Sequence, residues 1–112
     1  MNPLHPTLAS GRWHTFSLAE QLGNIGSDIS RALHAKEAGD STHMQPALDR
    51  ALELFDLTMT DPKHRGRRLR EICRMREAVC DYFFGENTYG STPATLDHYF
   101  LTLALLARKA RA

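Results

Sequence analysis

Hydrophobic residues recur with a helical period in four successive stretches of this chain. The first stretch repeats at spacings of four and three: Leu18, Leu22, Ile25, Ile29 and Ala32. Such spacing is typical of a helix that turns one face towards a core. Ser17 and Glu20 form a capping-box pattern before it, and the stripe ends at Lys36. The pattern predicts a first helix over residues 18–36.

Three further helices follow the same reasoning, with predicted ranges 43–60, 61–84 and 93–108. Thr42 begins a second capping-box pattern, while Asp61-Pro62 and Thr92-Pro93 each place proline directly after a residue that caps helices. No stretch alternates hydrophobic and polar residues as a strand would. Four amphipathic helices with short connections predict an all-α fold, an up-down-up-down four-helix bundle.

Residues 1–16 differ from the rest because Pro3, Pro6 and Gly11 interrupt any regular pattern. Four hydrophobic residues of this segment are candidates to dock on a core: Leu4, Leu8, Trp13 and Phe16. We therefore expect an irregular N-terminal lead-in over residues 1–16 and a four-helix bundle domain over residues 17–112.

Composition adds limits to this picture. The 112 residues are 42% hydrophobic and 24% charged, which suits one globular domain, and the formal net charge is only +1. The most apolar run, from Tyr99 to Ala107, is too short to span a bilayer. Two cysteines and no signal-peptide pattern favour a reducing environment. We expect a cytoplasmic protein with no membrane partner.

Charge is nevertheless uneven along the chain. Residues 63–76 hold seven basic residues and one acidic residue, whereas residues 15–61 hold eight acidic and three basic ones. At about 100° per residue, one stripe of the predicted third helix lies roughly opposite its apolar face: Lys63, Arg67, Arg70 and Arg74. Arginine binds phosphate with two parallel hydrogen bonds, so the stripe is a candidate contact for RNA, DNA or an acidic protein. The alternatives are a solvated face, or a contact with the acidic stripe of the predicted second helix (Asp49, Glu53 and Asp56) in another subunit.

One basic residue, Arg76, falls instead on the apolar face of the third helix. A buried guanidinium needs a partner, and Asp28 and Gln21 border the apolar stripe of the first helix. We expect a buried polar network of Gln21, Asp28 and Arg76 that fixes the helix register. The alternative is a small enzyme with a polar pocket between helices, in which Asn24 and Arg31 also take part.

Three features favour association with another molecule. Leu101 and Leu105 lie opposite the main apolar stripe of the fourth helix, which predicts a homo-oligomer or a protein partner. Gly23 and Gly26 lie inside the first helix, where close approach of another helix or a ligand explains them. Tyr89, in the loop of residues 85–91, is a candidate anchor for a larger protein.

Catalytic and metal-binding patterns are incomplete. Cys73 and Cys80 lie about 10 Å apart on one helix, too far for a disulfide, and we expect them to pack in the core. The six histidines lack the spacing of a zinc or di-iron site. Glu53 and Asp56 resemble only half of the acidic motif of all-α pyrophosphohydrolases, and no arginine precedes a histidine as in HEPN-type ribonucleases. We predict no catalytic residue, metal or cofactor.

A family resemblance rests on three parts of the chain, residues 17–27, 51–62 and 81–92. Their matching pieces are, in that order, SLAEQLGNIGS, ALELFDLT followed by DP, and DYFFG followed by YGST. They resemble a group of small uncharacterised bacterial and archaeal proteins, over roughly residues 12–108. In helix number, length and basic third helix the chain is similar to four-helix proteins encoded in ribosomal RNA intervening sequences. It is likewise similar to accessory proteins of diversity-generating retroelements. These resemblances imply a ring-like homo-oligomer with a basic surface that binds nucleic acid.

The sequence thus predicts a non-enzymatic, homo-oligomeric binding or scaffold protein. Its basic third-helix face is expected to contact nucleic acid or an acidic partner. There are two alternatives. One is a small enzyme with a pocket around Asp28 and Arg76, and the other is a self-assembling protein that binds a larger protein.

Overall fold

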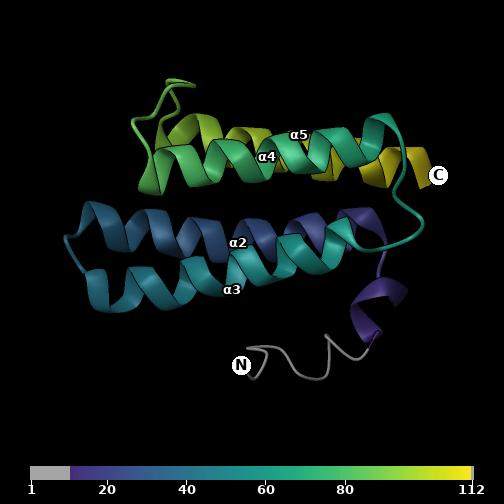
Figure 1. The fold of residues 1–112 in the computed structure, drawn as a ribbon, viewed down its shortest axis with the longest axis horizontal. Coiled ribbons are helices and arrows are strands. Elements are labelled where there is room, and N and C mark those ends of the chain that lie inside the picture. The colour runs from purple at the N-terminus through teal and green to yellow at the C-terminus, as the bar shows by residue number, and fades with distance from the viewer. Residues whose placement is uncertain (1–10, 112) are drawn as a thin grey trace.

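The chain is all-helical in the computed structural model, which describes residues 11–111 and the side chains of residues 11–109. A short 3-10 helix, η1 (Arg12–Thr15), precedes four long helices (Figure 1). These are α2 (Leu18–Glu37), α3 (Ser41–Met59), α4 (Arg67–Phe84) and α5 (Pro93–Arg111). The described residues contain no strand, so the all-α prediction is confirmed.

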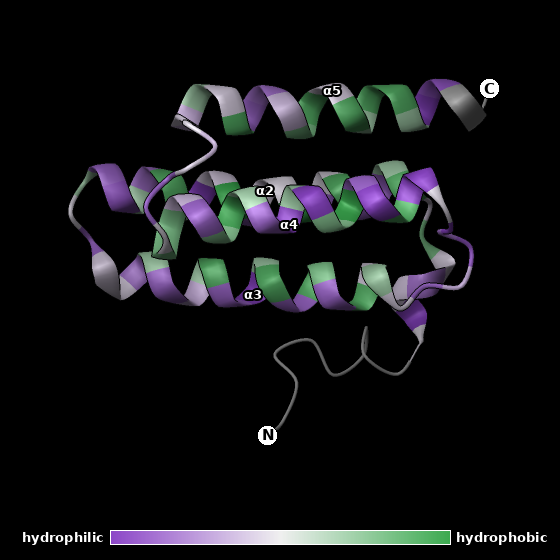
Figure 2. Cartoon of the chain, turned by 45° about the horizontal axis from the view of Figure 1, so that its top comes forward, coloured by the Kyte–Doolittle hydropathy of each residue, from purple (hydrophilic) through white to green (hydrophobic). Residues whose placement is uncertain are grey.

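Helix α2 lies at the centre of the packing, because it contacts both α3 and α5, while α3 also packs against α4 and η1. Hydrophobic and hydrophilic bands alternate along the helices, as Figure 2 shows. Ile25, Ile29, Phe55 and Val79 are fully buried where these helices meet. The hydrophobic period of the sequence therefore identifies the core-facing sides of α2 and α3.

Side chains that were predicted to cap helices do so at two of the four starts. Ser17 and Glu20 form a reciprocal capping box at the start of α2. Thr92 accepts a hydrogen bond from the backbone N–H of Thr95 at the start of α5. Helix α3 begins two residues before its predicted start, because Asp40 caps it in place of Thr42 by accepting from the N–H of His43.

The predicted start of the third helix is wrong. Asp61 and Pro62 form a turn, in which an Asp61 carboxylate oxygen accepts from the backbone N–H of Lys63, and α4 begins only at Arg67. Gly66 just before it has a φ of 61°, outside the helical region, so the chain cannot continue as one helix from Pro62. Lys63 consequently lies off the helix.

The end of the predicted lead-in belongs to the core. Trp13 is 1% exposed, its indole N–H donates to the Thr58 hydroxyl at 2.8 Å, and its ring packs edge-on against Phe16. The predicted docking of Leu4 and Leu8 lies outside the described residues. Within the described part of the chain, every helix is too short or too polar to cross a bilayer.

Candidate functional site

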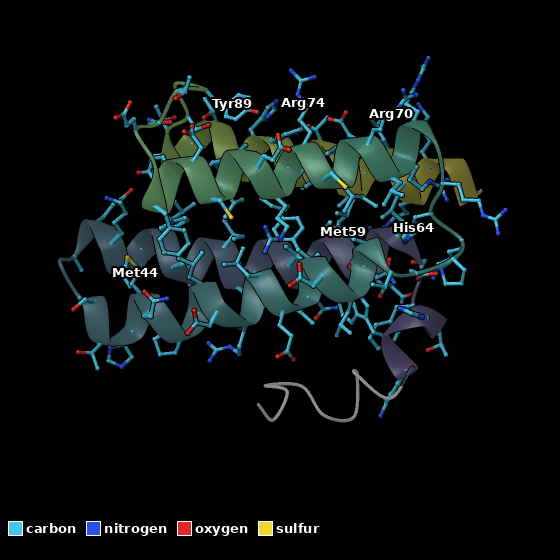
Figure 3. The ribbon with its side chains drawn as sticks, viewed as in Figure 1. Met44, Met59, His64, Arg70, Arg74 and Tyr89 are labelled. Atoms are coloured by element: carbon cyan, nitrogen blue, oxygen red, sulfur yellow. The ribbon has the colours of Figure 1, made fainter. Side chains whose placement is uncertain are left out.

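The outer side of α4 carries the predicted basic face, reduced to Arg67, Arg70 and Arg74. All three residues are exposed, and within residues 11–109 no hydrogen bond or ion pair involves their side chains. In Figure 3, Arg70 and Arg74 lie along the edge of α4 that faces away from α3. We call Arg67, Arg70 and Arg74 the basic face of α4.

Lys63, the fourth residue predicted for this face, is engaged elsewhere. Its ammonium group donates to the backbone carbonyl of His14 at 2.8 Å and pairs with the Asp61 carboxylate. The structure therefore does not bring Lys63 into line with the arginines, because the turn before Gly66 interrupts the helix on which that alignment was based.

An aromatic side chain lies beside the arginines. Arg70, Arg74 and Tyr89 line one open depression of about 530 Å³, together with Leu69, Cys73 and Glu77. The Tyr89 ring is half exposed, and its hydroxyl donates to a Glu77 carboxylate oxygen at 3.1 Å. This hydrogen bond is the main reason why the pKa of Tyr89 is raised. The site thus joins two cations to one aromatic face, an arrangement suited to a ligand with phosphates and planar rings.

The loop that presents Tyr89 is held by α4 itself. The two carboxylate oxygens of Asp81 accept from the backbone N–H groups of Thr88 and Tyr89, each at 3.0 Å. These bonds favour the charged carboxylate and lower the pKa of Asp81. Asn87 reinforces the loop through two hydrogen bonds with Ser91, each at 2.8 Å. Tyr89 is therefore placed against α4 by a folded loop.

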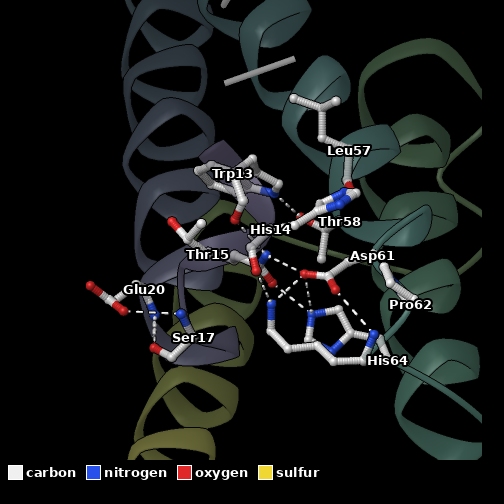
Figure 4. A network of polar contacts seen from close by, with 12 residues as sticks. Trp13, His14, Thr15, Ser17, Glu20, Leu57, Thr58, Asp61, Pro62 and His64 are labelled. Carbon is white, nitrogen blue, oxygen red and sulfur yellow. Dashed lines mark hydrogen bonds and ion pairs between the residues drawn. The ribbon is translucent and has the colours of Figure 1, made fainter. Parts of the chain in front are cut away.

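A second group of polar residues lies buried at the other end of α4. The Gln21 amide donates to the carbonyl of Trp13 at 3.0 Å and to the Asp61 carboxylate at 2.9 Å. Its oxygen therefore accepts from Nε2–H of His64, at 2.6 Å. Figure 4 shows Trp13, Thr58, Asp61 and His64 converging from η1, α3 and the turn. We call Gln21, Asp61 and His64 the buried polar cluster.

Burial and hydrogen bonding act in opposite directions on Asp61. Burial alone raises its pKa, but the hydrogen bonds from Lys63 and Gln21 outweigh it and lower the pKa to about 2. Burial is also the main cause that lowers the pKa of His64, whose Nδ1 has no hydrogen-bond partner among the described residues. Both side chains are almost inaccessible, so the cluster joins segments of the fold and offers no surface to a substrate.

The predicted network of Gln21, Asp28 and Arg76 does not form. The Arg76 guanidinium donates to the Asp56 carboxylate on α3 at 3.0 Å. The Asp28 carboxylate instead pairs with Arg31 at 2.8 Å, and the same oxygen lies 3.6 Å from Nε of Arg50. The buried side of α4 is centred on Ile72, Met75 and Val79, so Arg76 lies at its border and reaches α3. Asp28 and Gln21 are buried, as expected, but in separate contacts.

Helix α5 exposes hydrophobic residues on its outer side. Leu101 and Leu105 are 59% and 53% exposed, while Leu106, which is 56% exposed, lines a depression formed with residues of α2 and α4. The two predicted core cysteines, Cys73 and Cys80, are free thiols of intermediate burial at the edge of the core. Among the described residues, no group of histidines, cysteines and carboxylates could hold a metal ion.

Comparison of the chain with protein-family models, curated proteins and solved structures finds no match. Its function has to be argued from the residues and contacts above.

Proposed function

We propose that this chain is a non-enzymatic, homo-oligomeric protein that binds single-stranded nucleic acid through the basic face of α4. One observation carries the proposal: Arg70 and Arg74, whose side chains make no hydrogen bond or ion pair within residues 11–109, line the same depression as the half-exposed Tyr89. Arginines bind the phosphates, and the tyrosine ring stacks on a base.

Nucleic acid fits this surface better than an acidic protein does. Carboxylates would use the arginines, but they would leave the aromatic ring beside them without a role. Single-stranded nucleic acid offers phosphates and planar bases at alternating positions, and stacking on an aromatic ring is insensitive to base identity.

The oligomer and the helix order are parts of the same proposal. Exposed Leu101 and Leu105 support self-association, since burying them against a second copy removes apolar surface from water. An up-down-up-down order of the four helices is supported by the short connections between successive helices.

Fluorescence anisotropy with short labelled oligonucleotides tests the nucleic-acid interface. Wild-type protein is titrated into single-stranded RNA, single-stranded DNA of the same sequence and the DNA duplex, at low and moderate salt. We expect binding to both single strands that weakens with salt. Arg74→Glu and Arg70→Glu each lower the affinity about tenfold or more, and each reduces the salt slope by about 1. Tyr89→Ala weakens binding to single strands but leaves the salt slope unchanged.

Arg12→Glu is the matched control, because Arg12 is an exposed arginine on η1, away from α4. Equal losses in Arg12→Glu and Arg74→Glu would show only a general effect of charge and would overturn the interface. Polyglutamate serves as a competitor. If it displaces RNA as well as unlabelled RNA does, and Tyr89→Ala has no effect, the face is a site for acidic protein and the proposal is wrong.

A further inference from the structure

We propose that two copies of this chain pair through α5, antiparallel and about a two-fold axis, with Asp97 of each copy opposite Lys109 of the other. This inference rests on the homo-oligomer of the proposed function and assigns it a specific interface. Four exposed residues at every fourth position form the surface that we call the α5 ridge: Asp97, Leu101, Leu105 and Lys109.

The α5 ridge lies on the outside of the molecule. Leu96 and Phe100 are buried and define the inner side of α5. At the helical period of about 100° per residue, Leu101 and Leu105 lie on a different side of the helix. Rows of side chains at every fourth position are the ridges that interlock when two helices pack across each other. The α5 ridge therefore has the geometry of a helix–helix contact, although no helix within the described residues covers it.

The order of residues along the ridge is self-complementary in one orientation. If a two-fold axis passes between Leu101 and Leu105 and the helices are antiparallel, Leu101 meets Leu105 of the second copy. The same register sets Asp97 against Lys109 of the second copy, and symmetry repeats both contacts. A parallel pairing would oppose like charges instead, Asp97 to Asp97 and Lys109 to Lys109. Charge thus selects the antiparallel pairing.

A hollow beside the ridge has room for a side chain of the second copy. It has a volume of about 270 Å³ between α2 and α5, and small residues of α2 form one wall: Gly23, Gly26, Ser27 and Ser30. Leu101 and Ala104 of α5 form part of the other wall. A leucine at the centre of the two-fold contact would enter this hollow as a knob enters a hole.

Gly23 supports this contact independently of the ridge. A glycine within a helix lowers its stability, and close approach of another segment is a common reason for one. Gly26 packs against its own chain, since an added Cβ would lie 3.5 Å from the Cβ of Phe100. An added Cβ at Gly23 would meet nothing within 4 Å. The described fold therefore gives no reason for Gly23, whereas an approaching second copy does.

The pairing is tested by reversing the charge at one position and then restoring charge complementarity with a second substitution. Sedimentation velocity at low salt measures how strongly each variant dimerises. The experiment is run at a fixed pH of about 8. Asp97→Lys and Lys109→Asp each place two like-charged pairs in the contact, and we expect each to weaken the dimer roughly tenfold or more. The double variant Asp97→Lys/Lys109→Asp restores both pairs and should recover most of the affinity. Mixing the two single variants should produce a heterodimer, because every pair then has opposite charges.

Controls separate the contact from folding and from net charge. Asp49→Lys makes the same charge change at an exposed position of α3 and should leave the dimer intact. Leu105→Asp should give a monomer whose far-ultraviolet circular dichroism matches the wild type, because Leu105 is more than half exposed. Gly23→Leu, which fills the hollow, should also dissociate the dimer.

Two results would overturn the pairing. Wild-type protein that stays monomeric at high concentration would remove both the oligomer and this interface. An oligomer that ignores the charge reversals, or a double variant no better than the singles, would leave the oligomer standing but reject the α5 pairing. Neither result bears on nucleic-acid binding, which the anisotropy assay reports separately through Arg70 and Arg74.

Discussion

The buried polar cluster and the basic face of α4 place polar side chains under opposite conditions. Gln21 uses both amide hydrogens and its carbonyl oxygen: one bond reaches Trp13 in η1, and two reach Asp61 and His64 in the turn before α4. Arg70 and Arg74 have no such bonds within residues 11–109, although each guanidinium carries five donors. The cluster joins segments of the fold, whereas within residues 11–109 the two arginine side chains add no hydrogen bond to it.

This difference separates structural residues from candidate functional ones. A buried polar group must be paired, because leaving it unpaired costs about 1–3 kcal/mol. A paired buried group thus needs no functional explanation. An exposed cation is satisfied by water, so the fold alone does not explain a set of them beside an aromatic ring, and such a set is a candidate ligand site.

Removal of the Trp13 ring should cause the largest loss of stability. Trp13→Ala removes a side chain that is 1% exposed and leaves the Thr58 hydroxyl without its donor. We expect the free energy of unfolding to fall by about 4 kcal/mol in urea denaturation. Arg74→Ala on the basic face should leave the same midpoint unchanged. A comparable loss in Arg74→Ala would end the distinction between the two regions.

Asp61→Ala should rank second. It removes a buried acceptor that the Lys63 ammonium group, the Gln21 amide and the backbone N–H of residue 63 all use. The expected loss is about 3 kcal/mol, again from urea denaturation.

Asp56→Ala is the matched control for Asp61→Ala, because Asp56 also accepts from a cation, Arg76, but its side chain is exposed. Its removal should change stability far less, since surface ion pairs contribute little. If both variants lost the same stability, burial would not be the deciding factor.

Acidification should weaken the fold through the cluster. Burial lowers the pKa of His64 below its ordinary 6.5, so His64 stays neutral in the folded chain while the unfolded chain gains a proton. The free energy of unfolding should therefore fall as the pH drops through 6.5. Asp61, with a pKa of about 2, adds a second loss between pH 3.8 and about 2.

Urea midpoints at about pH 7.5 and about pH 5.5 measure the first of these losses. His64→Gln keeps a donor towards Gln21 and removes the titrating group, so its stability should change less over this interval. A wild-type midpoint that rises on acidification would contradict the sign derived from the burial of His64.

The sequence predicted the helices well because their signals are local. Hydrophobic spacing and the caps at Ser17 and Thr92 act within a few residues. Asp61-Pro62 was misread because aspartate before proline suits both a helix start and a turn. Gly66 was the available sign that a helix begins later, since its positive φ interrupts the chain just before Arg67.

The site was less predictable because its contacts join distant segments. The arginine spacing on α4 identified Arg67, Arg70 and Arg74 as outward-facing. The position of Tyr89 beside them depends on the loop that Asp81 folds back, and no periodic pattern encodes it. The pairing of Asp28 with Arg76 failed because a small rotation of α4 places Met75, not Arg76, at the centre of its buried side.

The smallest predicted effect concerns two glycines with open space around them. Gly23→Ala should raise the free energy of unfolding by about 0.5–1 kcal/mol in dilute protein, because alanine favours the helix and an added Cβ meets nothing within 4 Å. Gly66→Ala makes the same change in equally open space, but the φ of 61° is unfavourable for alanine, so stability should fall. Urea denaturation at low concentration measures both variants. A loss of stability in Gly23→Ala would mean that the surface of α2 beside the hollow is already filled in the single chain.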